Sequence, residues 1–245
     1  MNIIYLAAGK SSRIFKDIKK PKCMVSLNNE TLIENLLKKA PNKLTKYVIT
    51  GFKSYVIKKY LKSKKIKNIN FLYNKFYNSR EMLYSMFFAM NKINANIIFS
   101  YSDISYERKI INNLIKKKSK NIVVPILDNW KQVWNQRKKN IRIDAEELLV
   151  DKKNKIILKI GTKLKKNFPK YQFMGIVYVP KILRDELIDF YKKKIIKKNI
   201  HTTNFLQSLI ENGFKIKYEI YTGRWYEFDD LDDYLTFKKN YKSFF

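Results

Sequence analysis

Apolar residues recur along the first half of the chain in two alternating arrangements. Mostly apolar runs predict buried strands of a parallel sheet at residues 2–6, 47–50, 70–73 and 96–101. Helically spaced apolar residues predict helices between these strands, at residues 31–37, 54–61 and 80–90. Strands and helices that alternate at these lengths predict βαβ units with right-handed crossovers.

The pattern changes after residue 121, where short strand-like runs are separated by polar turns. We expect strands at residues 122–126, 147–150, 156–160, 174–179 and 215–220, and helices at 182–191 and 204–211. A short alternating run then leads from Trp225 to Asp229, and the acidic residues that follow indicate the start of a last helix, where the helix dipole favours carboxylates. The sequence therefore predicts one α/β domain whose second half has an α+β character.

The chain carries a large positive charge. Of its 245 residues, 52 are Lys or Arg and 21 are Asp or Glu, so the net charge is +31. Such a charge is typical of proteins that bind nucleic acid. Only seven of the cations are Arg, however, and the Lys residues are spread in short runs, whereas nucleic-acid surfaces concentrate cations and use Arg for bidentate contacts. The pattern favours solvated faces with one site for a polyanionic small molecule, and we expect no nucleic-acid partner.

Other counts exclude several classes of protein. The single Cys23 excludes an internal disulfide framework, and the single His201 excludes a multi-His metal centre. No apolar run approaches the roughly 18–20 residues that a membrane span requires, and no secretory signal is evident. We therefore expect a cytoplasmic protein without a membrane partner.

The end of the first predicted strand is a candidate phosphate-binding loop. Small residues there let backbone N–H groups approach a phosphate closely, and Arg13 and Lys22 supply positive charge. The loop is neither a Walker A loop nor G-x-G-x-x-G, and an ordinary strand turn with solvated cations is the alternative. The candidate residues are Leu6, Ala7, Ala8, Gly9, Lys10, Ser11, Ser12, Arg13 and Lys22.

Two carboxylates are candidate metal ligands. Asp103 follows a buried strand, and ligands of open α/β sheets bind beyond the carboxyl ends of the strands. Asp229 ends the short run that begins at Trp225. Together they could hold Mg²⁺, which takes one or two carboxylates plus substrate phosphates. The alternatives are a helix N-cap for Asp103 and a capped, acidic helix start for the second cluster, which is the interpretation we favour for Asp230, Asp232 and Asp233.

A group at helical spacing in the middle of the chain has two interpretations. Trp130, Trp134 and Arg137 either line a pocket or cover a hydrophobic edge, and the sequence does not separate these.

The candidate clusters resemble those of the nucleotidyltransferases that join a nucleoside triphosphate to a small phosphorylated compound and release pyrophosphate. The segment from Leu6 to Arg13, with Pro21-Lys22, is similar to the nucleotide loop of that family, although Ser11 stands where a second glycine is usual. Asp103 and Asp229 resemble its two metal carboxylates. The resemblance implies a Rossmann-like (GT-A-like) fold: a mixed, mainly parallel sheet flanked by helices, with a small α+β acceptor-binding insertion.

The middle region is similar to one subgroup, the cytidylyltransferases of phosphonate and capsule headgroup pathways, which act on phosphocholine, 2-aminoethylphosphonate or phosphoglutamine. Arg80-Glu81 depart from the Thr-Asn that is common there. The residues that carry the similarity are Tyr84-Ser85, Asn129-Trp130, Trp134, Arg137, Asp144-Ala145-Glu146, Ile160-Gly161 and Gln172-Phe173-Met174-Gly175.

This similarity implies a Mg²⁺-dependent cytidylyltransferase that joins CTP to a small phosphorylated or phosphonylated headgroup for capsule or cell-surface decoration. A sugar-1-phosphate nucleotidyltransferase using UTP or dTTP, and a basic RNA-binding protein, remain alternatives, and a homodimer is conceivable. Within a single domain of residues 1–245, it implies a nucleotide-binding half at about 1–120, an acceptor-binding part at about 121–200 and a metal-carboxylate segment at about 201–245. The implied roles are catalysis for Arg13, Lys22, Asp103 and Asp229, nucleotide binding for Ser85 as well as the loop, and acceptor binding for Trp130, Arg137, Asp144, Glu146 and Gln172.

Overall fold

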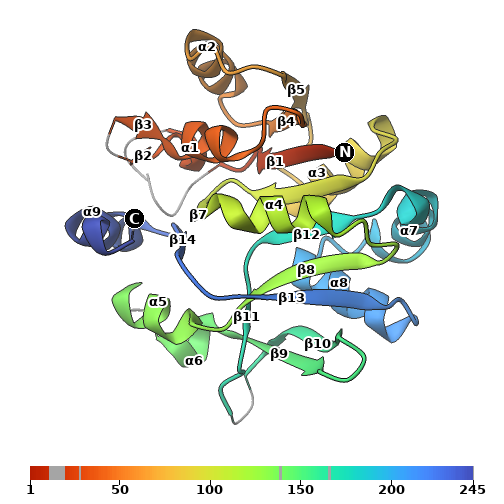
Figure 1. Cartoon of the computed structure of the whole chain (residues 1–245). Coiled ribbons are helices and arrows are strands. Elements are labelled where there is room, and N and C mark those ends of the chain that lie inside the picture. Colours follow the sequence, from red (N-terminus) through yellow and green to blue (C-terminus); the bar gives the residue numbers. More distant parts are fainter. Residues whose placement is uncertain (11–19, 28, 138–139, 165–166, 245) are drawn as a thin grey trace.

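A ten-stranded sheet forms the centre of the molecule (Figure 1). The computed structural model describes residues 1–10, 20–27, 29–137, 140–164 and 167–244. The strand order is β5 (Ile69–Tyr73), β4 (Thr45–Thr50), β1 (Asn2–Ala7), β6 (Ile97–Tyr101), β12 (Ile176–Val179), β8 (Ile122–Leu127), β13 (Ile216–Tyr221), β10 (Ile156–Lys163) and β9 (Glu146–Asp151), and β11 (Gln172–Phe173) pairs with β8 beside this path.

The strand directions follow the division of the chain into halves. Strands β5, β4, β1 and β6 are parallel to one another, and β8 is parallel to β13. Strand β12 lies between these two groups, antiparallel to both β6 and β8, and β10 and β9 extend the sheet as an antiparallel pair. The predicted fold class, a mixed and mainly parallel sheet with an α+β part, is confirmed.

Helices cover both faces of the sheet because the strands are apolar on both sides. In β1, Ile3 and Tyr5 join a core cluster that contains residues of α1, α2 and α4, whereas Ile4 and Leu6 join a second cluster with residues of α3, α7 and α8. The helices are α1 (Leu32–Lys39), α2 (Ser54–Ser63), α3 (Met82–Lys92), α4 (Arg108–Lys116), α5 (Trp130–Arg137), α6 (Ile141–Asp144), α7 (Arg184–Phe190), α8 (Thr202–Glu211) and α9 (Leu231–Phe244). None of these helices combines the length and the apolar character that a membrane crossing needs, among the residues described.

Short elements at the edge of the sheet complete the fold. Strand β7 (Ile104–Tyr106) pairs with β14 (Trp225–Glu227), and β2 (Ser26–Leu27) pairs with β3 (Glu30–Thr31). The helical turns are the 3-10 helices η1 (Lys22–Met24) and η2 (Lys181–Leu183) and the π-helix η3 (Tyr191–Ile195), which continues α7. The alternating run from Trp225 thus forms the expected short strand, and its partner β7 is an element that the apolar pattern did not predict.

The strand predicted at residues 174–179 is shorter in the structure, where β12 covers residues 176–179. A separate short strand, β11, precedes it at residues 172–173 and pairs with β8, while β12 pairs with both β6 and β8. Gly175 stands between them with a φ of +71°, a conformation in which a side chain is strained. A Cβ atom there would also lie 2.9 Å from the ring of Tyr101. Glycine at this position lets the chain turn between the two strands without strain.

Candidate active site

The candidate site lies at the carboxyl ends of the two adjacent parallel strands β1 and β6. Leu6 of β1 is paired with Tyr101 of β6, and the buried Ser102 donates a hydrogen bond of 2.7 Å to the Leu6 carbonyl. This bond fixes the chain just before Asp103, which therefore projects from the sheet edge where open α/β sheets bind ligands.

The β7–β14 pair brings Asp229 to Asp103 from the other end of the sequence. Glu227 of β14 is paired with Ile104 of β7, and the Phe228 amide donates a hydrogen bond of 2.8 Å to the Asp103 carbonyl. The residues that follow these bonds are consequently held side by side. The two carboxylates that the sequence singled out are thus neighbours in the structure.

Lys22 lies between the two carboxylates. Its Nζ is 2.9 Å from Asp103 Oδ2 and 3.3 Å from Asp229 Oδ1. Burial would lower the pKa of Lys22, but the adjacent carboxylates of Asp103 and Asp229 outweigh burial and raise this pKa above the ordinary lysine value. A positive charge therefore stands at the point where both acidic side chains converge.

The oxygen atoms at this point suit a divalent cation whose coordination shell is completed by a bound ligand. Asp103 Oδ1 is buried and has no hydrogen-bond partner among the described residues, and a buried polar atom without a partner is costly. Within the same residues, no three His, Cys, Asp or Glu side chains form a cluster that holds a metal by themselves. Mg²⁺ commonly binds one or two carboxylates and takes its other ligands from phosphates and water, so Asp103 and Asp229 fit it.

A third carboxylate, Glu227, belongs to the site although the sequence analysis did not single it out. Its position two residues before Asp229 is the signal that could have found it, because alternate residues of a strand point to the same side. Burial raises the pKa of Glu227 well above its usual range, the charge of Asp229 adds to this effect, and the Arg137 guanidinium opposes it.

Two cavities meet at this edge of the sheet. The first, here called the Ser85 cavity, measures about 430 Å³, and the second, the Gln172 cavity, about 340 Å³. Glu81 and Met82 line both, so the cavities are adjacent. The two convergent carboxylates, Asp103 and Asp229, line the Gln172 cavity.

The Ser85 cavity contains much of the predicted phosphate-binding loop. Its wall includes Leu6, Ala8, Gly9 and Lys10, whereas the side chain of Ala7 belongs to the core. Ser85 is buried and accepts a hydrogen bond of 3.0 Å from Asn74 Nδ2, another residue of this wall. The remaining residues predicted for the loop, Ser11, Ser12 and Arg13, lie outside the described part of the chain.

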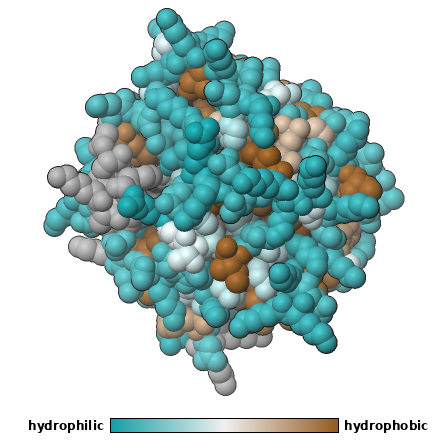
Figure 2. Space-filling model, viewed as in Figure 1, coloured by the Kyte–Doolittle hydropathy of each residue, from teal (hydrophilic) through white to brown (hydrophobic). Residues whose placement is uncertain are grey.

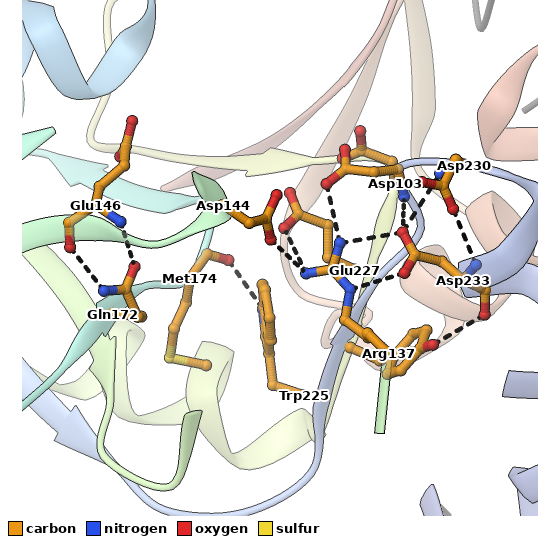
Figure 3. Close-up of polar contacts among 12 residues, drawn as sticks. Asp103, Arg137, Asp144, Glu146, Gln172, Met174, Trp225, Glu227, Asp230 and Asp233 are labelled. Carbon is orange, nitrogen blue, oxygen red and sulfur yellow. Dashed lines mark hydrogen bonds and ion pairs between the residues drawn. The ribbon is translucent and has the colours of Figure 1, made fainter. Parts of the chain in front are cut away.

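The Gln172 cavity contains three of the predicted acceptor residues: Asp144, Glu146 and Gln172. The Gln172 side chain donates to the Glu146 carbonyl at 2.7 Å and accepts from the Glu146 amide at 3.3 Å, so this pair ties β11 to the start of β9 (Figure 3). Glu146 Oε1 accepts a hydrogen bond from the Thr203 hydroxyl. Burial nevertheless raises the pKa of Glu146.

The other two predicted acceptor residues lie beneath the cavity, which corrects the expectation that they contact a ligand directly. Trp130 is completely buried, and its indole N–H donates to the Pro169 carbonyl at 3.2 Å. The side chain of Arg137 is also fully buried, against carboxylates. Trp134, from the same face of α5, lines the cavity instead. The pocket interpretation thus holds for Trp134 alone, whereas Trp130 belongs to the hydrophobic core and Arg137 is buried among carboxylates.

The acidic helix start that we favoured for the residues after Asp229 is present in the structure. Asp230 Oδ1 accepts a hydrogen bond from the Asp233 amide at 3.0 Å, and Asp233 Oδ2 accepts one from the Asp230 amide at 3.3 Å. This reciprocal pair caps α9. Asp233 is also completely buried, which the sequence did not predict.

Comparison with known proteins shows which class of enzyme has this fold. No family model matches the chain. The chain is similar in structure to the CTP:phosphocholine cytidylyltransferase LicC from Streptococcus pneumoniae, with a TM-score of 0.70, 18% identity and coverage of 97% of both chains. It is also similar to the inositol-1-phosphate CTP transferase from T. maritima, with a TM-score of 0.73, 17% identity and coverage of 97% of this chain and 95% of that one. The fold is that of a nucleotidyltransferase.

Sequence similarity defines the family more narrowly. The chain is 30% identical to the CTP:phosphoglutamine cytidylyltransferase of Campylobacter jejuni, over 95% of this chain and 97% of that protein. At this identity and coverage, the chain belongs to the cytidylyltransferase family of nucleotidyltransferases.

Proposed function

We propose that this enzyme transfers CMP from CTP to a small acceptor that carries both a phosphate or phosphonate and an ammonium group, and that it releases pyrophosphate. The observation that carries the proposal is the convergence of Lys22, Asp103 and Asp229 beside two adjacent cavities. One cavity would hold CTP and the other the acceptor, so the reacting groups would meet beside the convergent charges. The product would serve capsule or other cell-surface decoration, and the enzyme would act in the cytoplasm.

The charge of the Gln172 cavity favours an acceptor with a cationic end. Although the protein is strongly basic overall, the ionisable residues that line this cavity are mostly acidic: Glu81, Asp103, Asp144, Glu146, Glu227 and Asp229, with His201 as the basic exception in the described part of the chain. A purely anionic acceptor would be repelled there. An ammonium group near Glu146 would be attracted, and the ring of Trp225 in the same wall could add a cation–π contact.

The reaction needs no general base. The attacking oxygen of a phosphate or phosphonate is already ionised; it forms the new bond to the α-phosphorus of CTP while the bond to pyrophosphate breaks. The protein then contributes positioning and neutralisation of charge. Lys22 neutralises the triphosphate, as Arg13 would, and Gly9 supplies a backbone N–H. When bound by Asp103 and Asp229, Mg²⁺ supplies Lewis-acid neutralisation of the phosphate oxygens.

A pyrophosphate-release screen tests the proposal. The four ribonucleoside triphosphates and dTTP are crossed with phosphocholine, phosphoethanolamine, 2-aminoethylphosphonate, phosphoglutamine and sugar 1-phosphates, in the presence of Mg²⁺. We expect turnover with CTP and one of the nitrogen-containing acceptors. Turnover confined to UTP or dTTP with a sugar phosphate would support the sugar nucleotidyltransferase instead. A homodimer and the absence of a nucleic-acid partner stay predictions, which light scattering and a salt-dependent RNA-binding assay address.

Glu146→Gln is expected to raise the KM for the acceptor about 10-fold or more, because it removes a charge-assisted contact to the ammonium group, with little change in kcat.

In the unmodified enzyme, the KM for the acceptor should rise as the pH falls, since protonation of Glu146 removes its negative charge. The raised pKa of Glu146 brings this rise closer to neutral pH than an ordinary glutamate would. Initial rates at a series of pH values measure both effects.

Glu147→Gln is the matched control for this prediction. Glu147 is the next residue on β9 and forms an ion pair with Lys159, and it does not line the Gln172 cavity. Its replacement should leave the acceptor KM and its pH dependence unchanged. An acceptor KM that is insensitive to Glu146→Gln at every pH would contradict the cationic end of the acceptor.

A further inference from the structure

Arg137 is a charged side chain that the reaction described above does not use. It projects from the last residue of α5, and its guanidinium is surrounded by carboxylates (Figure 3). Its Nε lies 2.9 Å from Asp233 Oδ1 and its Nη2 lies 3.0 Å from Asp233 Oδ2, a two-pronged contact between two side chains that are both completely buried. Such bidentate pairs fix geometry as well as charge.

The same guanidinium also holds Asp229. Arg137 Nη2 is 3.0 Å from Asp229 Oδ2, while the other oxygen, Oδ1, faces Lys22 at 3.3 Å. Asp233 holds the backbone at this point, because its Oδ2 accepts a hydrogen bond of 2.8 Å from the Asp229 amide. The orientation of the Asp229 carboxylate is thus set from its side chain by Arg137 and from its main chain by Asp233.

Aromatic rings fix the guanidinium itself. The Arg137 guanidinium carbon lies 5.0 Å from the centre of the Trp134 ring. That ring is stacked on Trp225, with 5.6 Å between centres and an interplanar angle of 7°. The Trp225 indole N–H donates to the Met174 carbonyl at 3.0 Å. The Arg137 guanidinium therefore lies over a ring that is itself held in a stacked pair, at a distance that permits a cation–π contact.

The positive charge of Arg137 also lies close to two further carboxylates, those of Glu227 and Asp144. Arg137 Nη1 is 3.5 Å from Glu227 and 3.6 Å from Asp144, both in the wall of the Gln172 cavity. Buried carboxylates that lie close together repel one another unless a cation stands between them. One guanidinium therefore lets several acidic groups stay together at the floor of the cavity.

We propose that Arg137, oriented by Asp233, is a positioning residue that turns the Asp229 carboxylate so that its Oδ1 lies on the side of Lys22, which also contacts Asp103, ready to bind a divalent cation. The inference rests on the proposed function, since it assumes that these two carboxylates bind the cation. Lysine cannot replace arginine in this role, because a single ammonium does not form the two-pronged contact to Asp233.

The test uses Mn²⁺ as a probe of the cation site, followed through the EPR signal of free Mn²⁺ and without CTP, acceptor or turnover. Arg137→Lys is expected to raise the Mn²⁺ dissociation constant about 10-fold or more, as is common when a group that orients a metal ligand is lost. In turnover assays, the KM for Mg²⁺ should rise more than the KM for CTP. Asp233→Asn keeps the shape of the side chain, loses the bidentate charge pair and should act in the same direction.

Arg108→Lys is the control, an exposed arginine at the start of α4 that should bind Mn²⁺ as the unmodified protein does. Circular dichroism establishes that each variant is folded, and Asp233→Asn keeps the test decisive if Arg137→Lys does not fold. Unchanged Mn²⁺ affinity in the folded variants would overturn the positioning role and leave the proposed function intact. Absence of Mn²⁺ binding by the unmodified enzyme, both without CTP and after CTP is added, would overturn the cation site itself, and this inference with it.

Discussion

Replacing Asp103 by asparagine is expected to lower kcat with CTP and Mg²⁺ about 10³-fold while leaving the fold intact. Asparagine has the shape of aspartate, and Lys22 keeps a second carboxylate partner in Asp229, so the structural cost is small. The substitution removes one of the two carboxylates that we propose to bind the metal, and with it electrostatic stabilisation of the reaction; changes of this kind cost several kcal/mol. Stopped-time assays of pyrophosphate release measure the effect.

Asp189→Asn provides the comparison, because Asp189 is an exposed aspartate on α7. Its turnover should equal that of the unmodified enzyme. Thermal unfolding of both variants shows whether any loss of activity has a structural origin. Full activity of folded Asp103→Asn protein would eliminate Asp103 as a metal ligand.

Lys22→Ala is expected to change two measurements in opposite directions. Turnover should fall about 10²-fold or more, because the cation that we propose to neutralise the triphosphate is lost. The affinity for Mn²⁺ alone should instead rise, since the Lys22 ammonium competes with a divalent ion for Asp103 Oδ2 and Asp229 Oδ1. The raised pKa of Lys22 keeps this competitor charged.

The same raised pKa predicts how the stability of the protein depends on pH. The stability that the ion pairs of Lys22 contribute should persist up to the ordinary lysine pKa and be lost as the pH rises through the higher pKa that Lys22 has in the folded protein.

Lys20→Ala is the matched control for the charge change, since Lys20 is an exposed lysine close by in the sequence. It should alter neither measurement appreciably. If Lys22→Ala binds Mn²⁺ more weakly than the unmodified enzyme, Lys22 does not compete with the ion. Unchanged turnover would remove its role at the triphosphate.

The sequence predicted the sheet edge well because its signals are local. The continuous apolar runs that became β1 and β6 are typical of strands buried on both faces, and the residue after such a run, Asp103, lies at the carboxyl end of its strand whatever the rest of the chain does. Asp229 followed from a short alternation that ended in an acidic residue. For Asp103 and Asp229, the place of the residue at the end of a predicted strand was enough to predict its place at the edge of the sheet.

The sequence could not separate the residues that face a cavity from those that support its floor. The spacing of Trp130, Trp134 and Arg137 places all three on one side of α5, but how deep each lies depends on elements far along the chain, such as β14 and α9. The bidentate contact between Arg137 and Asp233 joins residues whose pairing no local pattern shows. Their joint burial could be learned only from the structure.

The pairing of β7 with β14 has a consequence for synthesis of the protein. Asp103 leaves the ribosome well before Asp229, and the strand that draws the second carboxylate into place, β14, is made immediately before it. A nascent or prematurely terminated chain that ends before β14 would lack Asp229, one of the two carboxylates that we propose to bind the metal, and we expect it to be inactive. Activity would thus begin only when synthesis of the polypeptide has passed β14, and incomplete chains would not consume CTP.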